Sequence, residues 1–331
     1  MKTITEVMQE ICKCIEAEPG SQKAHSLEKA VSVLSGHQRI AFSISGGSDS
    51  DTILDLYELL KPYLWGSPEV RFVFFDTGLE YEASKRHLEY LGITIDREKP
   101  RKSIVTACNE HGVPFFTKAV SEMMNMLQMH NFDWLDASEV ATAEKYGKCE
   151  SGLKWWFHRY PANVKPFYTI RRHRLLREFI MLKPPFFTIS AKCCDYAKKY
   201  TSDDYIKKHN IDLVVMGMRK AESGRRAVSV NGCFSLGDSS DASRFNPLLY
   251  WTDADKAAYK KWRNIRYSDC YEVYGMKRTG CAGCPFNSKA EDDLKKAEPF
   301  EPQLVKAARN IFADSYEYKR QYIEFKNRRK G

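Results

Sequence analysis

The residues with the clearest chemical potential lie in a short serine- and glycine-rich segment, residues 45–50. An apolar run at residues 40–44 precedes it and apolar residues at helical spacing follow, so the pattern predicts a strand, a turn and a helix. Two adjacent glycines let a ligand approach the backbone, and the amide groups at a helix start attract anions. The expected phosphate contacts are Ser45, Gly46, Gly47, Ser48, Asp49 and Ser50. The alternative is an ordinary strand–helix turn capped by serine and aspartate.

Two further polar segments follow apolar runs that read as strands. Asp76 and Thr77 come after residues 71–75, and a basic segment, residues 217–226, comes after residues 211–216. In an open parallel sheet, ligands bind outside the carboxyl ends of the strands, so these segments could converge on one nucleotide. Arginines in the basic segment could hold phosphate by paired hydrogen bonds, although a surface ion pair is the simpler alternative. The expected contacts there are Gly217, Arg219, Glu222, Ser223 and Arg226.

Cysteine spacing gives a second signal. The chain has ten cysteines, and its first residues have no apolar stretch of the kind that marks a signal peptide, so we expect a cytoplasmic protein. In that setting, many cysteines favour metal or redox chemistry over disulfides. Cys281 and Cys284 form a C-x-x-C turn that can direct two thiolates at one metal, and Cys193 and Cys194 are the expected other half. The alternative is a set of buried free cysteines.

The motifs resemble a known superfamily. The segment Ser-Gly-Gly-x-Asp-Ser after the first strand resembles the pyrophosphate loop of ATP pyrophosphatases, which cleave ATP between its α and β phosphates. The Asp76-Thr77-Gly78 strand end and residues 217–226 resemble the phosphoadenosine phosphosulfate (PAPS) reductase branch. The resemblance implies an α/β fold with a parallel twisted sheet covered by helices on both faces, and a mainly helical C-terminal region with a cysteine cluster. It also implies that ATP and Mg²⁺ are bound, with Asp49, Arg219 and Arg226 as catalytic residues.

The cysteine pattern extends the resemblance. A Cys-Cys pair followed by basic residues, and then a distant C-x-x-C, is similar to the [4Fe-4S] ligand set of assimilatory adenosine phosphosulfate reductases. The resemblance therefore implies a cluster on Cys193, Cys194, Cys281 and Cys284. Zinc stays an alternative, as does replacement of one ligand by Cys233 or Cys270.

Two departures bear on the reaction. The loop keeps the form found in ATP-cleaving members of the superfamily, and no cysteine follows Cys284 where the reductases carry a nucleophilic one near their C-terminus. The resemblance then implies an ATP pyrophosphatase that adenylates an acceptor, a nucleic acid or a nucleotide, for sulfur transfer, with a sulfur-donor protein as a potential partner. The alternatives are a true PAPS or adenosine phosphosulfate reductase, and a non-catalytic nucleic-acid-binding module of a defence or modification complex.

Composition and turn-forming residues predict how the chain is divided into segments. We expect a helical segment at 1–36, the α/β nucleotide-binding domain at 37–235 with an insertion near 101–185, and a helical region at 244–331; residues 234–243 read as the joining loop. Strands are expected to begin near residues 40, 71, 93, 186 and 211.

The segment from Lys154 to Arg177 is basic and aromatic. It contains seven Lys or Arg residues, several aromatics and no acidic residue, which suits contact with nucleic acid; the alternative is a basic helix face with packed aromatics. The net charge of +9 favours an anionic partner, and no apolar run is long enough to span a membrane.

Overall fold

The computed structural model describes residues 2–134, 147–160, 169–222, 230–237 and 241–329, and the chain divides into two compact units. Unit 1 comprises Met1–Asp76, Glu80–Lys99 and Tyr200–Gly280, and unit 2 comprises Thr77–Leu79, Pro100–Lys199 and Cys281–Gly331. Most of unit 2 is thus the long segment between the third and fourth strands. The serine- and glycine-rich loop lies in unit 1, whereas the two cysteine pairs lie in unit 2.

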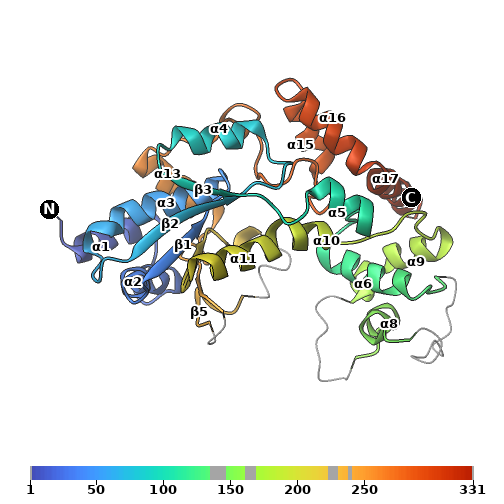
Figure 1. Ribbon diagram of the computed structural model, residues 1–331, viewed down its shortest axis with the longest axis horizontal. Coiled ribbons are helices and arrows are strands. Elements are labelled where there is room, and N and C mark those ends of the chain that lie inside the picture. The colour runs from blue at the N-terminus through green and yellow to red at the C-terminus, as the bar shows by residue number, and fades with distance from the viewer. Residues whose placement is uncertain (1, 135–146, 161–168, 223–229, 238–240, 330–331) are drawn as a thin grey trace. The chain divides into compact units, whose positions relative to one another are not determined.

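A six-stranded sheet in the order β3-β2-β1-β4-β6-β5 forms the centre of unit 1 (Figure 1). Its strands are β1 (Arg39–Ser43), β2 (Glu69–Phe75), β3 (Ile95–Glu98), β4 (Leu213–Met216), β5 (Phe234–Ser235) and β6 (Ser243–Phe245). Four of the five neighbouring pairs are parallel, and β5 runs antiparallel to β6. The chain winds from β1 to β3 on one side and then continues with β4 on the other, so the winding reverses between β1 and β4. A crevice outside the strand ends is expected at such a reversal.

Alternating side chains of the central strands bury both faces of this sheet. In β1, Ile40 and Phe42 belong to the larger apolar core, whereas Ala41 belongs to a smaller core on the opposite face. This follows from the two-residue period of a strand. Helices α1, α2, α3 and α13 contribute to the larger core and α11 to the smaller one. The predicted fold class, a parallel sheet with helices on both faces, is confirmed.

The helices of unit 1 begin and end at residues suited to those positions. They are α1 (Ile4–Cys14), α2 (Gln22–Ser35), α3 (Ser48–Leu60), α4 (Glu82–Tyr90), α11 (Tyr200–His209), α13 (Asp253–Arg263), α14 (Asp269–Glu272) and 3₁₀ turns at Lys61–Tyr63 and Lys220–Glu222. Helix α13 starts with a capping box, in which Thr252 and Asp255 bond each other's backbone N–H groups. It ends at Asn264, whose φ of 52° lies in the left-handed region where asparagine is tolerated. These caps fix where the side chains of α13 lie along its axis.

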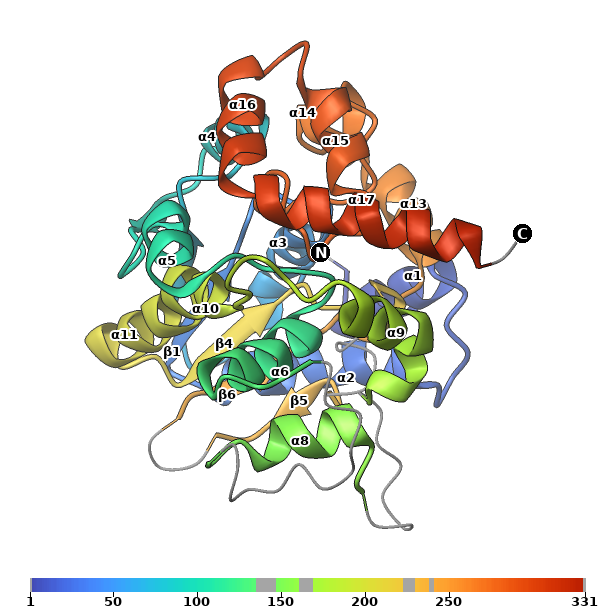
Figure 2. The same ribbon diagram turned by 90° about the vertical axis from the view of Figure 1, so that its right-hand side faces the viewer.

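Unit 2 is helical and packs around aromatic rings. Its helices are α5 (Ile104–His111), α6 (Lys118–Met129), α8 (Glu150–Phe157), α9 (Arg174–Leu182), α10 (Lys192–Cys194), α15 (Ala290–Ala297), α16 (Pro302–Ile311), α17 (Ala313–Arg328), a 3₁₀ turn at Ile170–His173 and a π-helical turn at Asp195–Lys199. Figure 2 shows α17 crossing beside α9, where Tyr318 of α17 packs on Phe179 and donates a 2.6 Å hydrogen bond to the carbonyl of Lys183.

Two expectations about strands are wrong. Residues near Phe186 form no strand, and the segment makes only a single bridge between Val113 and Ile189. Pro184 and Pro185 precede it, and proline lacks the N–H that a sheet ladder needs. The expected joining loop at 234–243 instead contributes β5 and the start of β6, because Ser243 extends the sheet by pairing beside Leu213 of β4. Within the described ranges, no helix combines the length and apolar character needed to cross a membrane.

Replacing Phe42 with alanine should strongly destabilise unit 1. The ring is 1% exposed at the centre of β1 and packs against Tyr57 and Phe72. A phenylalanine-to-alanine change in such a core costs about 3–5 kcal/mol in the free energy of unfolding. Chemical denaturation followed by circular dichroism measures it. Trp65→Ala is the matched control, because this ring is 58% exposed; equal effects of both changes would contradict the assignment of the core.

Candidate functional site

The loop after β1 closes on itself at the start of α3. The Ser45 N–H donates to the hydroxyl of Ser50 at 3.1 Å, and the two hydroxyl oxygens are also 3.1 Å apart. Gly46 has a φ of 63°, and a Cβ placed on it would lie 2.6 Å from the carbonyl oxygen of Ser84. Gly47 occupies the N-cap position of α3 without a side-chain cap. The turn therefore requires glycine at position 46 and presents the amino end of a 13-residue helix.

The loop after β4 meets this turn. A Cβ placed on Gly217 would lie 2.8 Å from the backbone carbonyl carbon and oxygen of Asp49. Only a residue without a side chain permits that approach. The two loops thus pack together at the winding reversal between β1 and β4, where the sequence predicted that they would converge.

Two cations reach the carboxylate of Asp49. The Nε of Arg219 lies 2.8 Å and the Nζ of Lys256 lies 2.9 Å from its Oδ1. Arg219 is 4% exposed and also bonds Asp253, a carboxylate that is 83% exposed and therefore well hydrated. Lys256 donates a second hydrogen bond, 2.8 Å long, to the hydroxyl of Ser48. Two shielded cations thus share one shielded carboxylate, while the charge of the second carboxylate, Asp253, is screened by water. Counting the shielded groups alone, the site is positive, which favours an anion.

Tyrosines from the segment after α13 also contact the loop. The Ser48 N–H donates to the phenolic oxygen of Tyr271 at 3.2 Å, and that oxygen lies 2.9 Å from the hydroxyl of Thr279. The ring of Tyr267 faces Lys256, with 6.0 Å between Nζ and the ring centroid. Burial raises the pKa of Tyr267 to about 12 and raises that of Tyr271 as well. Both phenols therefore stay neutral at physiological pH.

Lys256, Tyr267 and Tyr271 were not predicted from the sequence. The available signal was the spacing along α13, where residues 256, 259 and 263 share one face. Tyr259 and Arg263 on this face both bond Asp55 of α3, with 2.8 Å between the phenolic oxygen and Oδ1 and 2.8 Å between Nε and Oδ1. Lys256, one turn earlier, therefore reaches the first turn of α3.

A buried acidic group lies one turn into α3. Oδ2 of Asp51 and Nε2 of His87 are 3.0 Å apart, and both side chains are almost fully buried. The two groups thus form a buried acid–imidazole pair. Burial raises the pKa of Asp51 above its ordinary value, and the attraction of His87 and Lys256 offsets this only in part.

The other expected nucleotide contacts are placed as follows. Asp76 follows β2, and its N–H donates to the carbonyl of Glu98 at 3.0 Å. Thr77, the next residue, belongs to unit 2, where its hydroxyl lies 3.7 Å from the sulfur of Cys281. Glu222 ends the short 3₁₀ turn at Lys220–Glu222. Ser223 and Arg226 lie outside the described residues.

The two cysteine pairs of unit 2 approach each other. Cys193 and Cys194 lie on α10, which packs against α5, and the π-helical turn Asp195–Lys199 follows at once. The Cys108 thiol on α5 and burial raise the pKa of Cys193 well above its ordinary value. Burial and the neighbouring Cys281 and Cys194 raise the pKa of Cys284 to about 12. Cys108 is a fifth thiol beside the predicted four, and its position in the sequence gave no sign of this.

A tight turn holds the C-x-x-C segment. The Cys284 N–H donates to the carbonyl of Cys281 at 3.2 Å, and Gly283 has a φ of 67°. A Cβ on Gly283 would lie 2.5 Å from the phenolic oxygen of Tyr316, which donates to the Gly283 carbonyl. On the other side, the Ala282 N–H donates to the carbonyl of Leu79 at 2.6 Å. The turn is thus fixed from both sides within unit 2.

The four thiols of the two pairs are candidate donors for a metal centre. Among the described residues, no three His, Cys, Asp or Glu side chains are arranged to hold one metal ion. The four predicted thiols nevertheless lie close enough to influence each other's pKa, and Lys118 and Lys198 lie near Cys194. A [4Fe-4S] cluster takes one thiolate per iron, so its ligands need not point at one atom. Thiol donors with nearby cations fit such a group.

The basic aromatic segment is only partly open to a ligand. Trp155 and Trp156 are buried in the core of unit 2, so neither ring is available to stack on a base. The guanidinium of Arg177 lies 5.1 Å from the centroid of the Trp156 ring. Arg171 and Arg172 are exposed. Packed aromatics, the alternative given above, describe both tryptophans, and residues 161–168 lie outside the described residues.

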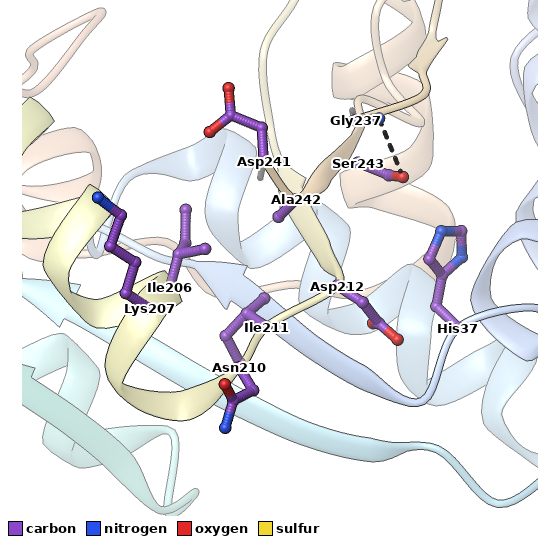
Figure 3. A pocket seen from close by; sticks show the side chains of 10 residues that line it. All are labelled: His37, Ile206, Lys207, Asn210, Ile211, Asp212, Gly237, Asp241, Ala242 and Ser243. Carbon is purple, nitrogen blue, oxygen red and sulfur yellow. Dashed lines mark hydrogen bonds between the residues drawn. The ribbon is translucent and has the colours of Figure 1, made fainter. Parts of the chain in front are cut away.

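A separate hollow of about 490 Å³ lies in unit 1 (Figure 3). His37, Lys207, Asp212 and Asp241 are among its lining residues. His37 and Asp212 precede β1 and β4, so the hollow is at the amino ends of these strands. The loop at residues 45–50 follows β1, so it lies at the other end of this strand, away from the hollow.

The fold, with its winding reversal between β1 and β4, defines a doubly wound α/β type of protein. Residues 158–287 match the model of the phosphoadenosine phosphosulfate reductase domain, so the family resemblance is confirmed. The matched range contains Arg219 and both cysteine pairs but not the loop at residues 45–50. Comparison with curated proteins gives no match.

Solved structures with similarity to this chain include three kinds of protein. A phosphoadenylyl-sulfate reductase from Candida auris, in a phosphate complex, is 14% identical with a TM-score of 0.42, over 85% of this chain and 97% of that one. FMN adenylyltransferase from Candida glabrata, with FAD and pyrophosphate, is 12% identical with a TM-score of 0.43, over 83% and 70%. The U34-tRNA thiolase NcsA from Methanococcus maripaludis, with its [4Fe-4S] cluster, is 14% identical with a TM-score of 0.37, over 96% and 78%.

Replacing Asp51 with asparagine should change how stability depends on pH. Because the folded pKa of Asp51 is raised, the folded chain binds this proton more tightly than the unfolded chain. The resulting stabilisation is present below the unfolded pKa, near 3.9, and is lost as pH rises through the folded pKa. Asp51→Asn should therefore gain stability relative to the wild type as pH increases from 4 to 8, measured by thermal unfolding. Asp253→Asn, at an exposed carboxylate, is the control; a difference for Asp51→Asn that stays flat or falls with pH contradicts the assignment.

Proposed function

We propose that this protein is an ATP pyrophosphatase that adenylates an acceptor ahead of sulfur transfer and carries an iron–sulfur cluster. One observation carries the proposal: the self-closed loop at residues 45–50 opens α3 at the winding reversal, where Arg219 bonds Asp49 and Gly217 packs against its backbone. The preserved Ser-Gly-Gly-x-Asp-Ser form of the loop favours cleavage of ATP over reduction of a sulfonucleotide. The family match at residues 158–287 is consistent with either reaction.

In the proposed reaction, an acceptor oxygen attacks the α-phosphorus of ATP while the bond to the β-phosphate oxygen breaks, releasing pyrophosphate. Amide groups at the start of α3 and the hydroxyls of Ser45 and Ser50 would bind the departing pyrophosphate. Arg219, nearly buried, would stabilise the added negative charge without the reorganisation that a hydrated side chain needs. Hydrosulfide from the sulfur donor would then attack the adenylated acceptor, and its new bond to sulfur would form as the bond to the oxygen of the departing AMP breaks.

The proposal includes two bound groups, Mg²⁺ and a [4Fe-4S] cluster. Carboxylate oxygens suit Mg²⁺, and Asp76, at the end of the strand beside β1, would hold it. The ion would neutralise charge on the pyrophosphate. Cys193, Cys194, Cys281 and Cys284 would hold a [4Fe-4S] cluster, which supplies an iron–sulfur centre for redox or sulfur chemistry. An exposed basic surface at Arg171 and Arg172 is where a nucleic-acid acceptor would make phosphate contacts.

Asp49→Ala should abolish adenylation. The change leaves Arg219 without its buried partner and removes the carboxylate that organises both cations, so we expect AMP formation to fall about 100- to 1000-fold, as for loss of a group that stabilises developing charge. Protein purified without oxygen is incubated with ATP, Mg²⁺ and candidate nucleic-acid or nucleotide acceptors, and AMP and pyrophosphate are quantified.

Asp253→Ala is the matched control, because Asp253 bonds the same guanidinium from its hydrated side. It should retain most of the activity. Sulfite release from PAPS and a thiol, without AMP formation from ATP, would instead establish a reductase. If neither product forms, and changing Arg171 and Arg172 to alanine abolishes nucleic-acid binding, the binding-module alternative replaces this proposal.

Cys281→Ser should lose the cluster. After anaerobic reconstitution with iron and sulfide, we expect about four irons and four sulfides per wild-type chain and less than half of that in the variant. Cys149→Ala is the control, since this cysteine is buried in the aromatic core of the same unit. Iron and acid-labile sulfide analyses with visible absorbance measure the result. Stoichiometric zinc with no iron or sulfide would contradict the cluster.

A further inference from the structure

We infer that Lys256 is a phosphate-binding residue, which delivers from α13 the ammonium group that the loop at residues 45–50 lacks. Its ligand would be the β- and γ-phosphates of ATP, or pyrophosphate. The inference rests on the proposed function and adds a residue that neither the motifs nor the family resemblance assigns.

The loop itself contains no cation. Residues 45–50 are serine, glycine and aspartate only. Phosphate-binding loops of the Walker type carry their own lysine, which acts as a point charge on the terminal phosphates. Asp49 adds negative charge at the position where phosphates would bind. A cation from elsewhere in the fold is therefore needed to favour a polyphosphate.

Lys256 is the cation whose position fits this need. Its Nζ lies 2.8 Å from the hydroxyl of Ser48, the first residue of α3, and 2.9 Å from Oδ1 of Asp49. An ammonium group has three N–H donors. Within the described part of the chain these two oxygens are its hydrogen-bond acceptors, which leaves one donor for a phosphate oxygen.

The surroundings hold this ammonium group in place. The capping box of Thr252 and Asp255 fixes the start of α13, and Tyr259 and Arg263 tie its next turns to Asp55 of α3. The Tyr267 ring faces the Nζ from 6.0 Å. The side chain is 13% exposed, so little hydration would be lost when a phosphate binds. A cation placed in advance binds its anion with little further ordering.

A purely structural ion pair with Asp49 is the competing explanation. Arg219 already bonds the same carboxylate oxygen at 2.8 Å. Asp51, the other nearby acid, is paired with His87 on the buried side of the helix. Asp253, the second partner of Arg219, is 83% exposed and hydrated, so Asp49 is the shielded carboxylate that the two cations share. The two explanations differ in whether the effect of Lys256 depends on Asp49.

The first measurement is the dissociation constant of the full-length protein for ATP, inorganic pyrophosphate and AMP, by isothermal titration calorimetry. Lys256→Met should weaken binding of ATP and pyrophosphate about 10- to 100-fold, the range for loss of a charge-assisted hydrogen bond, and change AMP binding less than about twofold. Lys256→Arg should restore part of the loss. Lys261→Met removes the same charge from an exposed position on α13 and should leave all three constants unchanged.

A second comparison separates direct contact from neutralisation of Asp49. In an Asp49→Asn background, the Lys256→Met change should still weaken ATP binding when Nζ contacts the phosphates. No further loss in that background would overturn the inference, as would equal weakening of ATP and AMP. If the wild type binds ATP but Lys256→Met binds it equally well, the inference alone fails. If the wild type binds neither ATP nor pyrophosphate, the proposed function fails and the inference with it. Unfolding temperatures of all variants confirm that they are folded.

Discussion

The ion pair between Arg219 and Asp49 is the interaction on which unit 1 depends. A nearly buried guanidinium is stable only if its charge is matched and its N–H groups are bonded, and Asp49, Asp253 and the carbonyl of Trp251 provide this. These partners come from α3 and from the start of α13, whereas the arginine follows β4. The need to neutralise Arg219 therefore holds the loop after β4 against the loop after β1.

The helix pair α3 and α13 extends this arrangement. Asp49 and Asp55 lie on α3. Asp49 is bonded by Arg219 and by Lys256 of α13, and Asp55 is bonded by Tyr259 and Arg263 of α13. A single surface ion pair contributes little to stability, but a network between capped helices restricts both of them. This arrangement also sets the charge around the start of α3. The helix start faces two shielded cations and one shielded carboxylate, and neutral phenols of Tyr267 and Tyr271 cover the same turn without adding charge.

In unit 2, burial and neighbouring thiols raise the pKa of three cysteines. The Cys108 thiol raises the pKa of Cys193, the Cys193 thiol raises that of Cys194, and burial raises that of Cys284. The raised pKa values make deprotonation of these thiols unfavourable. A bound metal centre would offset this cost, because it takes the place of the thiol protons. The turn at Gly283, fixed by Tyr316 and by the backbone of Leu79, places Cys281 and Cys284 without needing the metal.

The sequence by itself determined the local features of this protein. Short apolar runs predicted four of the strands, Gly46 and Gly47 predicted the turn before α3, and residue spacing predicted the C-x-x-C turn, because each depends on neighbours within a few residues. The structure alone decided the rest. Pro184 and Pro185 prevented the strand expected near Phe186, and β6 formed only because β4 offered a free edge. The apolar cluster that contains Trp155 and Trp156 also includes Tyr318 and Tyr322 of α17, which lie more than 150 residues away in the chain. Lys256, Tyr271 and Cys108 reach their sites through packing between helices, and no local pattern specifies such contacts across long stretches of chain.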